Sequence, residues 1–112
     1  MNKYQNKKTE IDGITFASRH EASRYAELKL LEKAGLITNL QLQRVYTLIG
    51  AQKDKEGKML ERPVKYIADF VYKDQKDRLI VEDAKSPATR TDVYKIKRKL
   101  MLSIYGLRIQ EV

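Results

Sequence analysis

Residues 65–85 read "KYIADFVYKDQKDRLIVEDAK", and this segment gives the clearest indication of the fold. Its two apolar segments are separated by the polar residues 73–77, "KDQKD", which is the pattern of two strands joined by a hairpin turn. Side chains alternate along a strand, so Asp69 and Asp83 each share a face with the apolar residues two positions away. Matching these apolar faces across the turn predicts that Asp69 lies directly opposite Asp83.

Two facing carboxylates on a half-buried sheet surface repel each other, and a divalent cation removes this penalty. Lys85 shares the face of Asp83 and adds a fixed positive charge beside the pair. The sequence has no cysteine and one histidine, His20, which we expect at the surface. Any metal ligands are therefore oxygen atoms, which favours magnesium, manganese or calcium. Glu82 faces the other side of the strand, and we expect it to be exposed or ion-paired.

Glu21 is a third candidate acid. Ser18 and Glu21 form a capping-box pattern, and Gly35 is a natural stop, so we expect a helix over about residues 19–34. Glu21 shares part of the apolar face of this helix with Tyr25, which predicts that its carboxylate points toward the core. The alternative is that Glu21 only completes the cap by bonding the backbone of Ser18.

The remaining predicted elements are further strands and a second helix. Asp12 and Gly13 suit a tight hairpin turn, residues 40–49 alternate as a long strand, and residues 51–63 form a polar connection. A second helix over about residues 92–105 precedes a short strand over residues 107–112. The apolar stripe of that helix consists of Val93, Ile96, Leu100 and Ile104. The order predicts one α/β domain over residues 1–112, with a mixed central β-sheet, an N-terminal helix and a basic C-terminal helix packed on it.

The charge of the chain indicates its class of partner. The net charge is +8, and between Lys85 and Lys99 six cationic residues face one acid, Asp92. Such a block favours a polyanion such as nucleic acid, although a solvated helix face would look the same. No apolar run approaches the roughly 20 residues that cross a bilayer, and the N-terminus lacks the apolar core of a signal peptide. We therefore expect a cytoplasmic protein with no membrane partner.

The aspartate in an apolar strand, the short hairpin, the Asp83-Ala84-Lys85 triplet and the helix that carries Glu21 together resemble the PD-(D/E)xK nuclease superfamily. Ala68 stands where the superfamily usually has proline. Nearly the whole chain looks like a small phage-borne family catalogued as a domain of unknown function. Its layout is similar to archaeal-type Holliday-junction resolvases and to transposase endonuclease subunits. The resemblance implies a restriction-endonuclease-like fold.

The resemblance also implies roles for individual residues. Asp69 and Asp83, helped by the backbone carbonyl of Ala84 and by Glu21, would hold one or two Mg²⁺ ions, with Mn²⁺ as a substitute. Lys85 would orient or help to deprotonate the attacking water and stabilise the transition state. Gln43 would lie near the metal, as a polar residue often does in related nucleases. The alternative for Gln43 is an ordinary amide at a strand edge.

The function that the resemblance implies is a Mg²⁺-dependent DNA endonuclease. The expected substrate is a Holliday junction or other branched DNA in phage recombination or replication, cut by a homodimer in the host cytoplasm. The residues that would contact the DNA backbone are Arg90, Lys95, Arg98 and Lys99. Two alternatives are a catalytically silent nucleic-acid-binding module that uses the basic helix, and a structural phage protein whose basic face contacts packaged DNA.

Overall fold

The computed structural model of the protein describes residues 8–85 and 87–112. In chain order its elements are β1 (Thr9–Ile11), β2 (Ile14–Phe16), α1 (Arg19–Lys33), β3 (Thr38–Ile49), β4 (Gln52–Lys53), β5 (Met59–Glu61), β6 (Val64–Lys73), β7 (Leu79–Asp83), the 3₁₀ turn η1 (Pro87–Thr89), α2 (Asp92–Tyr105) and β8 (Ile109–Glu111). Neither helix in this described part of the chain is long and apolar enough to cross a membrane.

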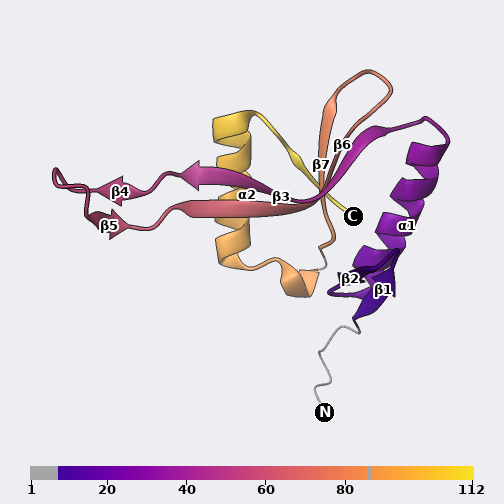
Figure 1. Ribbon diagram of the computed structural model, residues 1–112, viewed down its shortest axis with the longest axis horizontal. Helices are drawn as coiled ribbons and strands as arrows, with labels where there is room; N and C mark the ends of the chain where they lie inside the picture. Colours follow the sequence, from indigo (N-terminus) through magenta and orange to yellow (C-terminus); the bar gives the residue numbers. More distant parts are fainter. Residues whose placement is uncertain (1–7, 86) are drawn as a thin grey trace, which may run out of the picture.

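The central sheet is mixed. β3, β6 and β7 form an antiparallel meander, and β8 joins β7 in parallel, which gives the order β3-β6-β7-β8. α1 packs against one end of the meander, and α2 crosses β3 and β6 nearer to their other end (Figure 1). The predicted α/β class, with a mixed central sheet, an N-terminal helix and a C-terminal helix, is confirmed.

The buried side chains form two clusters that meet in the middle of β6. One cluster packs α1 on Phe70 and Tyr72, and the other packs α2 on Tyr66 and Ala68. Each fully buried apolar side chain contributes about 1.5–3 kcal/mol, so both helices are fixed firmly to this strand. Asp69 lies between Ala68 of one cluster and Phe70 of the other. Its position is therefore determined by the packing of both helices.

The N-terminal hairpin holds the first turn of α1. Asp12 and Gly13 have φ angles of 56° and 76°, as the predicted two-residue turn requires. The ring of Phe16 packs on Tyr25 with 4.9 Å between the centroids. Ser18 is the N-cap of α1, as expected, and its side chain accepts a hydrogen bond from the backbone N–H of Glu21. These contacts keep the start of α1 beside the sheet.

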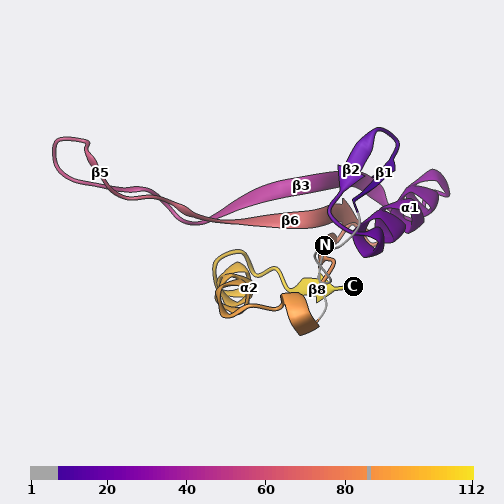
Figure 2. The ribbon, with the colours of Figure 1, turned by 90° about the horizontal axis from the view of Figure 1, so that it is seen from below.

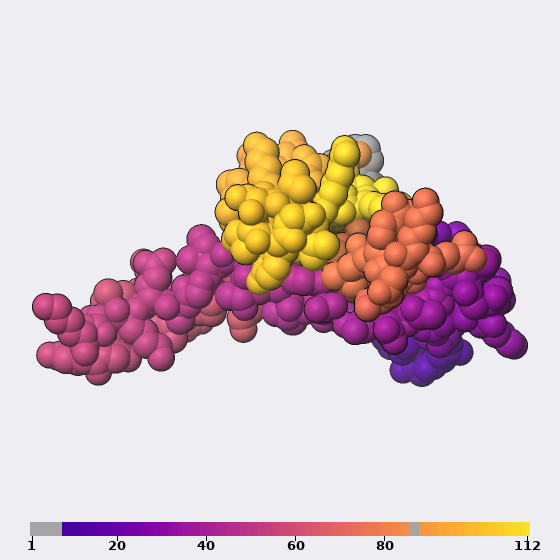
Figure 3. All heavy atoms as spheres, turned by 90° about the horizontal axis from the view of Figure 1, so that it is seen from above, coloured from indigo at the N-terminus to yellow at the C-terminus, as the bar shows by residue number. Residues whose placement is uncertain are grey.

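β3 and β6 extend outward as a long two-stranded ribbon, here called the arm (residues 44–68), which ends in β4 and β5 (Figures 1 and 2). The polar connection expected over residues 51–63 thus contains two short strands and projects from the body of the molecule (Figure 3). Val45 and Ile67, which pair across the arm, are 52% and 51% exposed. This face of the arm continues along β6 to Asp69.

α2 leaves three of the four residues of its predicted apolar stripe exposed, whereas the fourth, Leu100, is half-buried and packs against the core. Tyr94 and Met101 are its buried residues, whereas Val93, Ile96 and Ile104 are exposed. An amphipathic helix ordinarily buries such a stripe. Adjacent residues lie about 100° apart around a helix, so a helix that buries Tyr94 leaves its neighbour Val93 on another face. The hydrogen bond from the Tyr94 hydroxyl to Glu111 of β8 and the packing of Met101 set the observed rotation.

Candidate functional site

The pairing of β6 with β7 brings Asp69 and Asp83 together. Phe70 pairs with Glu82, so the next pair in the same register is Asp69 and Asp83. Asp69 Oδ2 also accepts a hydrogen bond of 2.9 Å from the backbone N–H of Ala84. The two carboxylates therefore lie at the end of β7, next to the peptide that follows it.

Asp83 is protonated far more readily than an ordinary aspartate. Its side chain is almost completely buried, and this burial, together with the adjacent Asp69, raises its pKa to about 7. The hydroxyl of Tyr66 and the charge of Lys85 act in the opposite direction. Tyr66 lies near Asp83, but its buried hydroxyl makes no hydrogen bond of regular geometry within the described residues. The acid pair thus holds a proton near neutral pH unless a cation replaces it.

Gln43 links Glu21 to the pair. Its Nε2 donates to Glu21 Oε1 at 3.3 Å and to Asp69 Oδ1 at 3.2 Å. Burial and the charge of Asp69 raise the pKa of Glu21, while a backbone hydrogen bond from Ala17 and the charge of Lys85 lower it. The backbone N–H of Glu21 donates to the side chain of Ser18, whereas its carboxylate faces Gln43 and the backbone of Ala17 rather than the backbone of Ser18.

The backbone of Gln43 adopts a left-handed conformation inside a strand, with φ of 54°. Its neighbours Leu42 and Arg44 keep regular pairing with β6, so the residue opposite Gln43 is Asp69. A side chain in this conformation costs roughly 1–2 kcal/mol, and such strain concentrates at functional sites. The strained residue lies where the sheet passes from the cluster of α1 to the cluster of α2.

Lys85 lies beside the pair, held by an aromatic ring. Its Nζ is 3.9 Å from Asp83 Oδ2 and 4.6 Å from the centroid of the Tyr94 ring. The Tyr94 hydroxyl donates to Glu111 Oε2 at 2.7 Å. Sequence reasoning did not find this role for Tyr94, because the contact depends on the rotation of α2.

The four cations predicted to contact DNA lie mostly around Glu111 and on the outer face of α2. Arg98 and Arg90 pair with Glu111 at 3.1 and 3.6 Å. Lys95 is exposed, and Lys99 lines a separate hollow of about 360 Å³ between α2 and β8. The structure does not bring these four residues into the hollow that contains Asp69 and Asp83.

That hollow has a volume of about 310 Å³ and lies between β6, β7 and α2. It contains Asp69, Asp83 and Lys85, and two cations outside the predicted set, Lys65 and Lys97, also line it. The alternation of β6 places Lys65 on the face of Asp69, which is the signal that could have identified it. A second hollow of about 420 Å³ on the other side of Asp69 contains Glu21 and Gln43.

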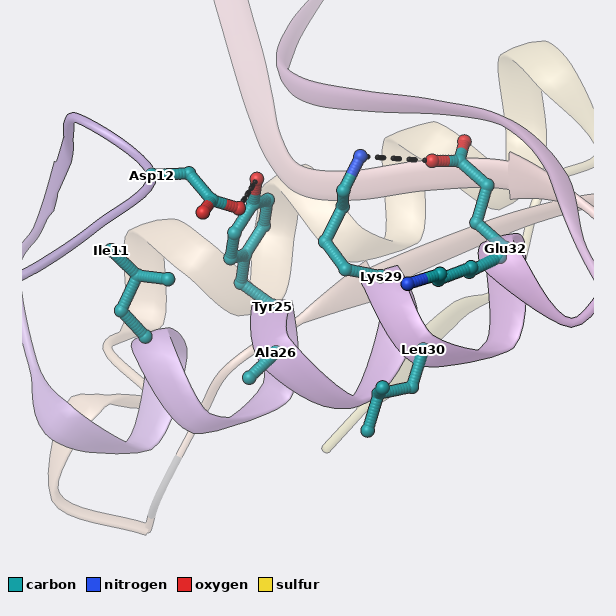
Figure 4. A pocket seen from close by; sticks show the side chains of 8 residues that line it. Ile11, Asp12, Tyr25, Ala26, Lys29, Leu30 and Glu32 are labelled. Atoms are coloured by element: carbon teal, nitrogen blue, oxygen red, sulfur yellow. Dashed lines mark hydrogen bonds and ion pairs between the residues drawn. The ribbon is translucent and has the colours of Figure 1, made fainter.

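A further hollow of about 660 Å³ lies between the N-terminal hairpin and the outer face of α1 (Figure 4). Four of its polar side chains pair with one another. Tyr25 donates to Asp12 at 2.9 Å, and Lys29 pairs with Glu32 at 3.1 Å. The two acids that line this hollow, Asp12 and Glu32, are thus each paired with a side chain of the same hollow, unlike the facing acid pair of the smaller hollow.

Glu82 is buried, contrary to one of the two expectations. It is 1% exposed and forms two hydrogen bonds with Arg24, from Nε at 2.8 Å and from Nη2 at 2.6 Å, and the Tyr72 hydroxyl also donates to it. The prediction of exposure is wrong because α1 covers this side of the sheet, whereas the prediction of an ion pair is confirmed. Glu82 therefore links α1 to β7 and is separate from the acid pair.

The acid pair offers part of the ligand set that a hard divalent cation needs. No group of three or more acids or histidines in the described part of the chain is close enough to form a ready metal site. Asp69 and Asp83 nevertheless supply two adjacent carboxylates, and the Gln43 amide links Asp69 to Glu21. The buried Tyr66 hydroxyl lies near Asp83 without a hydrogen bond of regular geometry among the described residues. Oxygen donors of this kind fit magnesium or manganese. His20, exposed as expected, instead contacts the backbone oxygen of Val112.

Comparisons with known proteins give one match. The sequence model of a family described as "Protein of unknown function (DUF1064)" matches residues 1–110. No curated protein and no solved structure matches the chain.

Proposed function

The chain belongs to the DUF1064 family, and we propose that it is a Mg²⁺-dependent DNA endonuclease of the PD-(D/E)xK type. The proposed substrate is a Holliday junction or other branched DNA in phage recombination or replication. One observation carries the proposal, namely that Asp69, Asp83 and Lys85 line a single hollow. A raised pKa in a buried acid that faces a second acid is typical of catalytic and metal-binding sites.

Asp69 and Asp83 are the proposed Mg²⁺ ligands, with Glu21, Gln43 and the peptide of Ala84 beside them. A bound Mg²⁺ or Mn²⁺ supplies a water of lowered pKa and neutralises charge on the scissile phosphate. Gln43 holds the carboxylates of Glu21 and Asp69 together before any ligand arrives. This preorganisation lowers the cost of assembling the site.

Lys85 is the proposed catalytic cation. Its ammonium group orients the attacking water and stabilises the negative charge that develops on the phosphate. The Tyr94 ring limits the rotamers of this long side chain, so that the ammonium group stays near Asp83.

DNA affinity comes from a basic face, which consists of Arg90, Lys95, Arg98 and Lys99. Lys95 and Lys99 contact phosphates directly, and Arg98 and Arg90 do so with the guanidinium N–H groups that Glu111 leaves free. The net charge of +8 favours this mode of binding, which weakens as the salt concentration rises.

A resolvase cuts two strands symmetrically, so we propose a two-fold homodimer in the host cytoplasm. The exposed stripe of α2, which includes Ile96 and Ile104, is the proposed interface. Exposed apolar patches of this kind mark interaction surfaces.

The decisive experiment is cleavage of a labelled four-way junction in Mg²⁺, beside a linear duplex of matching sequence. Paired, symmetric nicks near the branch point that disappear in Asp83→Asn support the resolvase. Equal cutting of the linear duplex retains the nuclease and rejects the preference for junctions. Tight binding without cutting in Mg²⁺ or Mn²⁺ rejects the nuclease in favour of the silent binding module.

A further inference from the structure

Two lysines face the hollow of the acid pair from opposite walls. Lys65 belongs to β6 and Lys97 to α2, and both line the hollow that contains Asp69 and Asp83. Within the described part of the chain, neither lysine takes part in an ion pair. Their charges are therefore available to an anion that enters the hollow.

Other cations near the site already have partners. Glu111 holds Arg90 and Arg98, and Lys85 lies between Asp83 and the Tyr94 ring. A phosphate bound at Lys65 and Lys97 does not have to displace such a contact. The two lysines thus form the part of the hollow best suited to attract a polyanion.

The edge of β6 is open at this point. Within residues 8–85 and 87–112, β7 pairs with β6 only from Phe70 to Lys73, so the segment from Lys65 to Ile67 has no described strand beside it on the side of α2. Lys65 is four residues before Asp69 on the same face, a separation of about 13 Å along the strand. A B-form strand advances about 3.4 Å per nucleotide along its axis, so this separation corresponds to about four nucleotides, or fewer in an extended strand.

The walls of the hollow are apolar between the lysines. Ile67 of β6 and Val93 of α2 both line it, and both are more than half exposed. Apolar walls with a cation on each side suit the sugars, bases and phosphates of one strand. A volume of about 310 Å³ is at the lower end for a ligand pocket, and it matches a few nucleotides of one strand better than the width of a duplex.

We propose that Lys65 and Lys97 form a phosphate clamp for a single, unpaired DNA strand that enters the hollow beside the scissile phosphate. The clamp rests on the proposed nuclease function and narrows its substrate class to DNA in which one strand leaves the duplex, as in a flap or an opened branch. Lys95, on the same helix, lies outside this hollow.

Binding without divalent cations tests the clamp independently of cleavage. Anisotropy of a labelled single-stranded oligonucleotide is compared with that of a duplex of the same length, over a range of salt concentrations. The variants are Lys65→Ala, Lys97→Ala and Lys97→Gln, which keeps most of the half-buried stem. Lys33→Ala on α1 and Lys76→Ala in the β6–β7 turn remove the same charge elsewhere.

We expect each clamp variant to weaken single-strand binding by about threefold to tenfold and to lower the salt slope by about 0.7. Duplex affinity should change by less than about twofold, as should both affinities of the control variants. Equal losses in clamp and control variants, or equal losses for single strand and duplex, would overturn the clamp.

Cleavage separates this inference from the function on which it rests. Absence of cutting by the wild-type protein in Mg²⁺ and Mn²⁺ rejects the nuclease, whatever the binding data show. If the wild-type protein cuts a flap or branch, the clamp variants should raise KM more than they lower kcat. Unchanged KM in Lys65→Ala and Lys97→Ala rejects the clamp and retains the nuclease.

Discussion

The ammonium group of Lys85 lies 4.6 Å from the centroid of the Tyr94 ring. Tyr94 is fixed in turn by the hydrogen bond of its hydroxyl to Glu111, which also pairs with Arg98. Lys85, which follows the end of β7, is therefore positioned by contacts from α2 and β8 as well as by its distance from Asp83. This chain of contacts connects the basic face of the protein to the acid pair.

The ring of Tyr94 should matter more to activity than its hydroxyl. We expect Tyr94→Leu to lower the cleavage rate constant by about tenfold, because a partly desolvated cation–π contact is worth on the order of 1–2 kcal/mol. Tyr94→Phe keeps the ring and should stay within about threefold of wild type. Single-turnover cleavage measures both, with circular dichroism to verify the fold. Equal losses in the two variants would contradict a positioning role for the ring.

The raised pKa of Asp83 makes stability depend on pH. Its folded-state pKa of about 7 lies above the value of about 3.9 for an unfolded aspartate, so the folded state binds the proton more tightly. The resulting stabilisation is fully present below about pH 4 and is lost as the pH rises through about 7, a change on the order of 4 kcal/mol. The raised pKa of Glu21 gives a contribution of the same sign.

Asp83→Asn should remove most of this dependence. Denaturant unfolding without divalent cations should show wild-type stability that falls between about pH 4 and about pH 8, relative to a flatter curve for the variant. The variant should be the more stable protein at the alkaline end. Parallel curves for the two proteins would contradict the assignment of the buried proton to the acid pair.

Divalent cations should stabilise the folded protein most where Asp83 is ionised. At about pH 8, Mg²⁺ or Mn²⁺ at a hundred times its Kd should add about 2.7 kcal/mol, seen as a rise in Tm, and the rise should shrink at about pH 5. Asp69→Asn and Asp83→Asn should lose the effect, whereas Glu56→Gln at the end of the arm should retain it. A rise of equal size in all four proteins would show that the cations bind elsewhere.

The sequence predicted the acid pair because two local patterns agree. An apolar alternation on each strand and a short polar turn leave one register for the hairpin, and this register faces Asp69 with Asp83. The rotation of α2 was not predictable in the same way. Most of its apolar stripe is exposed, and the buried Tyr94 instead donates a hydrogen bond to Glu111 of β8. Such a choice depends on contacts between residues that are distant in sequence.

The backbone conformation of Gln43 and the shape of the arm escaped prediction for a different reason. The pattern over residues 40–49 is that of an ordinary strand, and no local signal indicates that Gln43 adopts a φ of 54°. Tertiary contacts with Glu21 and Asp69 accompany that conformation. Only the end of the arm, which contains β4 and β5, has no layer packed on it, and such an exposed ribbon has the polar composition of a loop.

The ion pair of Arg24 with Glu82 should be costly to break on one side only. Arg24→Leu leaves the buried carboxylate of Glu82 without its cation and should lower the free energy of unfolding by about 3–5 kcal/mol. Arg24→Leu combined with Glu82→Leu should recover a large part of that loss, because the paired charges are replaced by apolar groups. Urea unfolding of the double-mutant cycle measures the difference. Additive losses would contradict the coupling.

The exposed stripe of α2 predicts where copies of the chain meet. Ile96 and Ile104 are 57% and 48% exposed, so a charged residue at either position should leave the fold intact. If the proposed dimer uses this stripe, Ile96→Glu and Ile104→Glu should be monomers in sedimentation velocity at concentrations where the wild-type protein is a dimer. Val45→Glu introduces the same charge at a comparably exposed apolar position on the arm, and it should remain dimeric. Monomers produced by Val45→Glu alone would place the interface on the arm, and a monomeric wild-type protein would reject the homodimer.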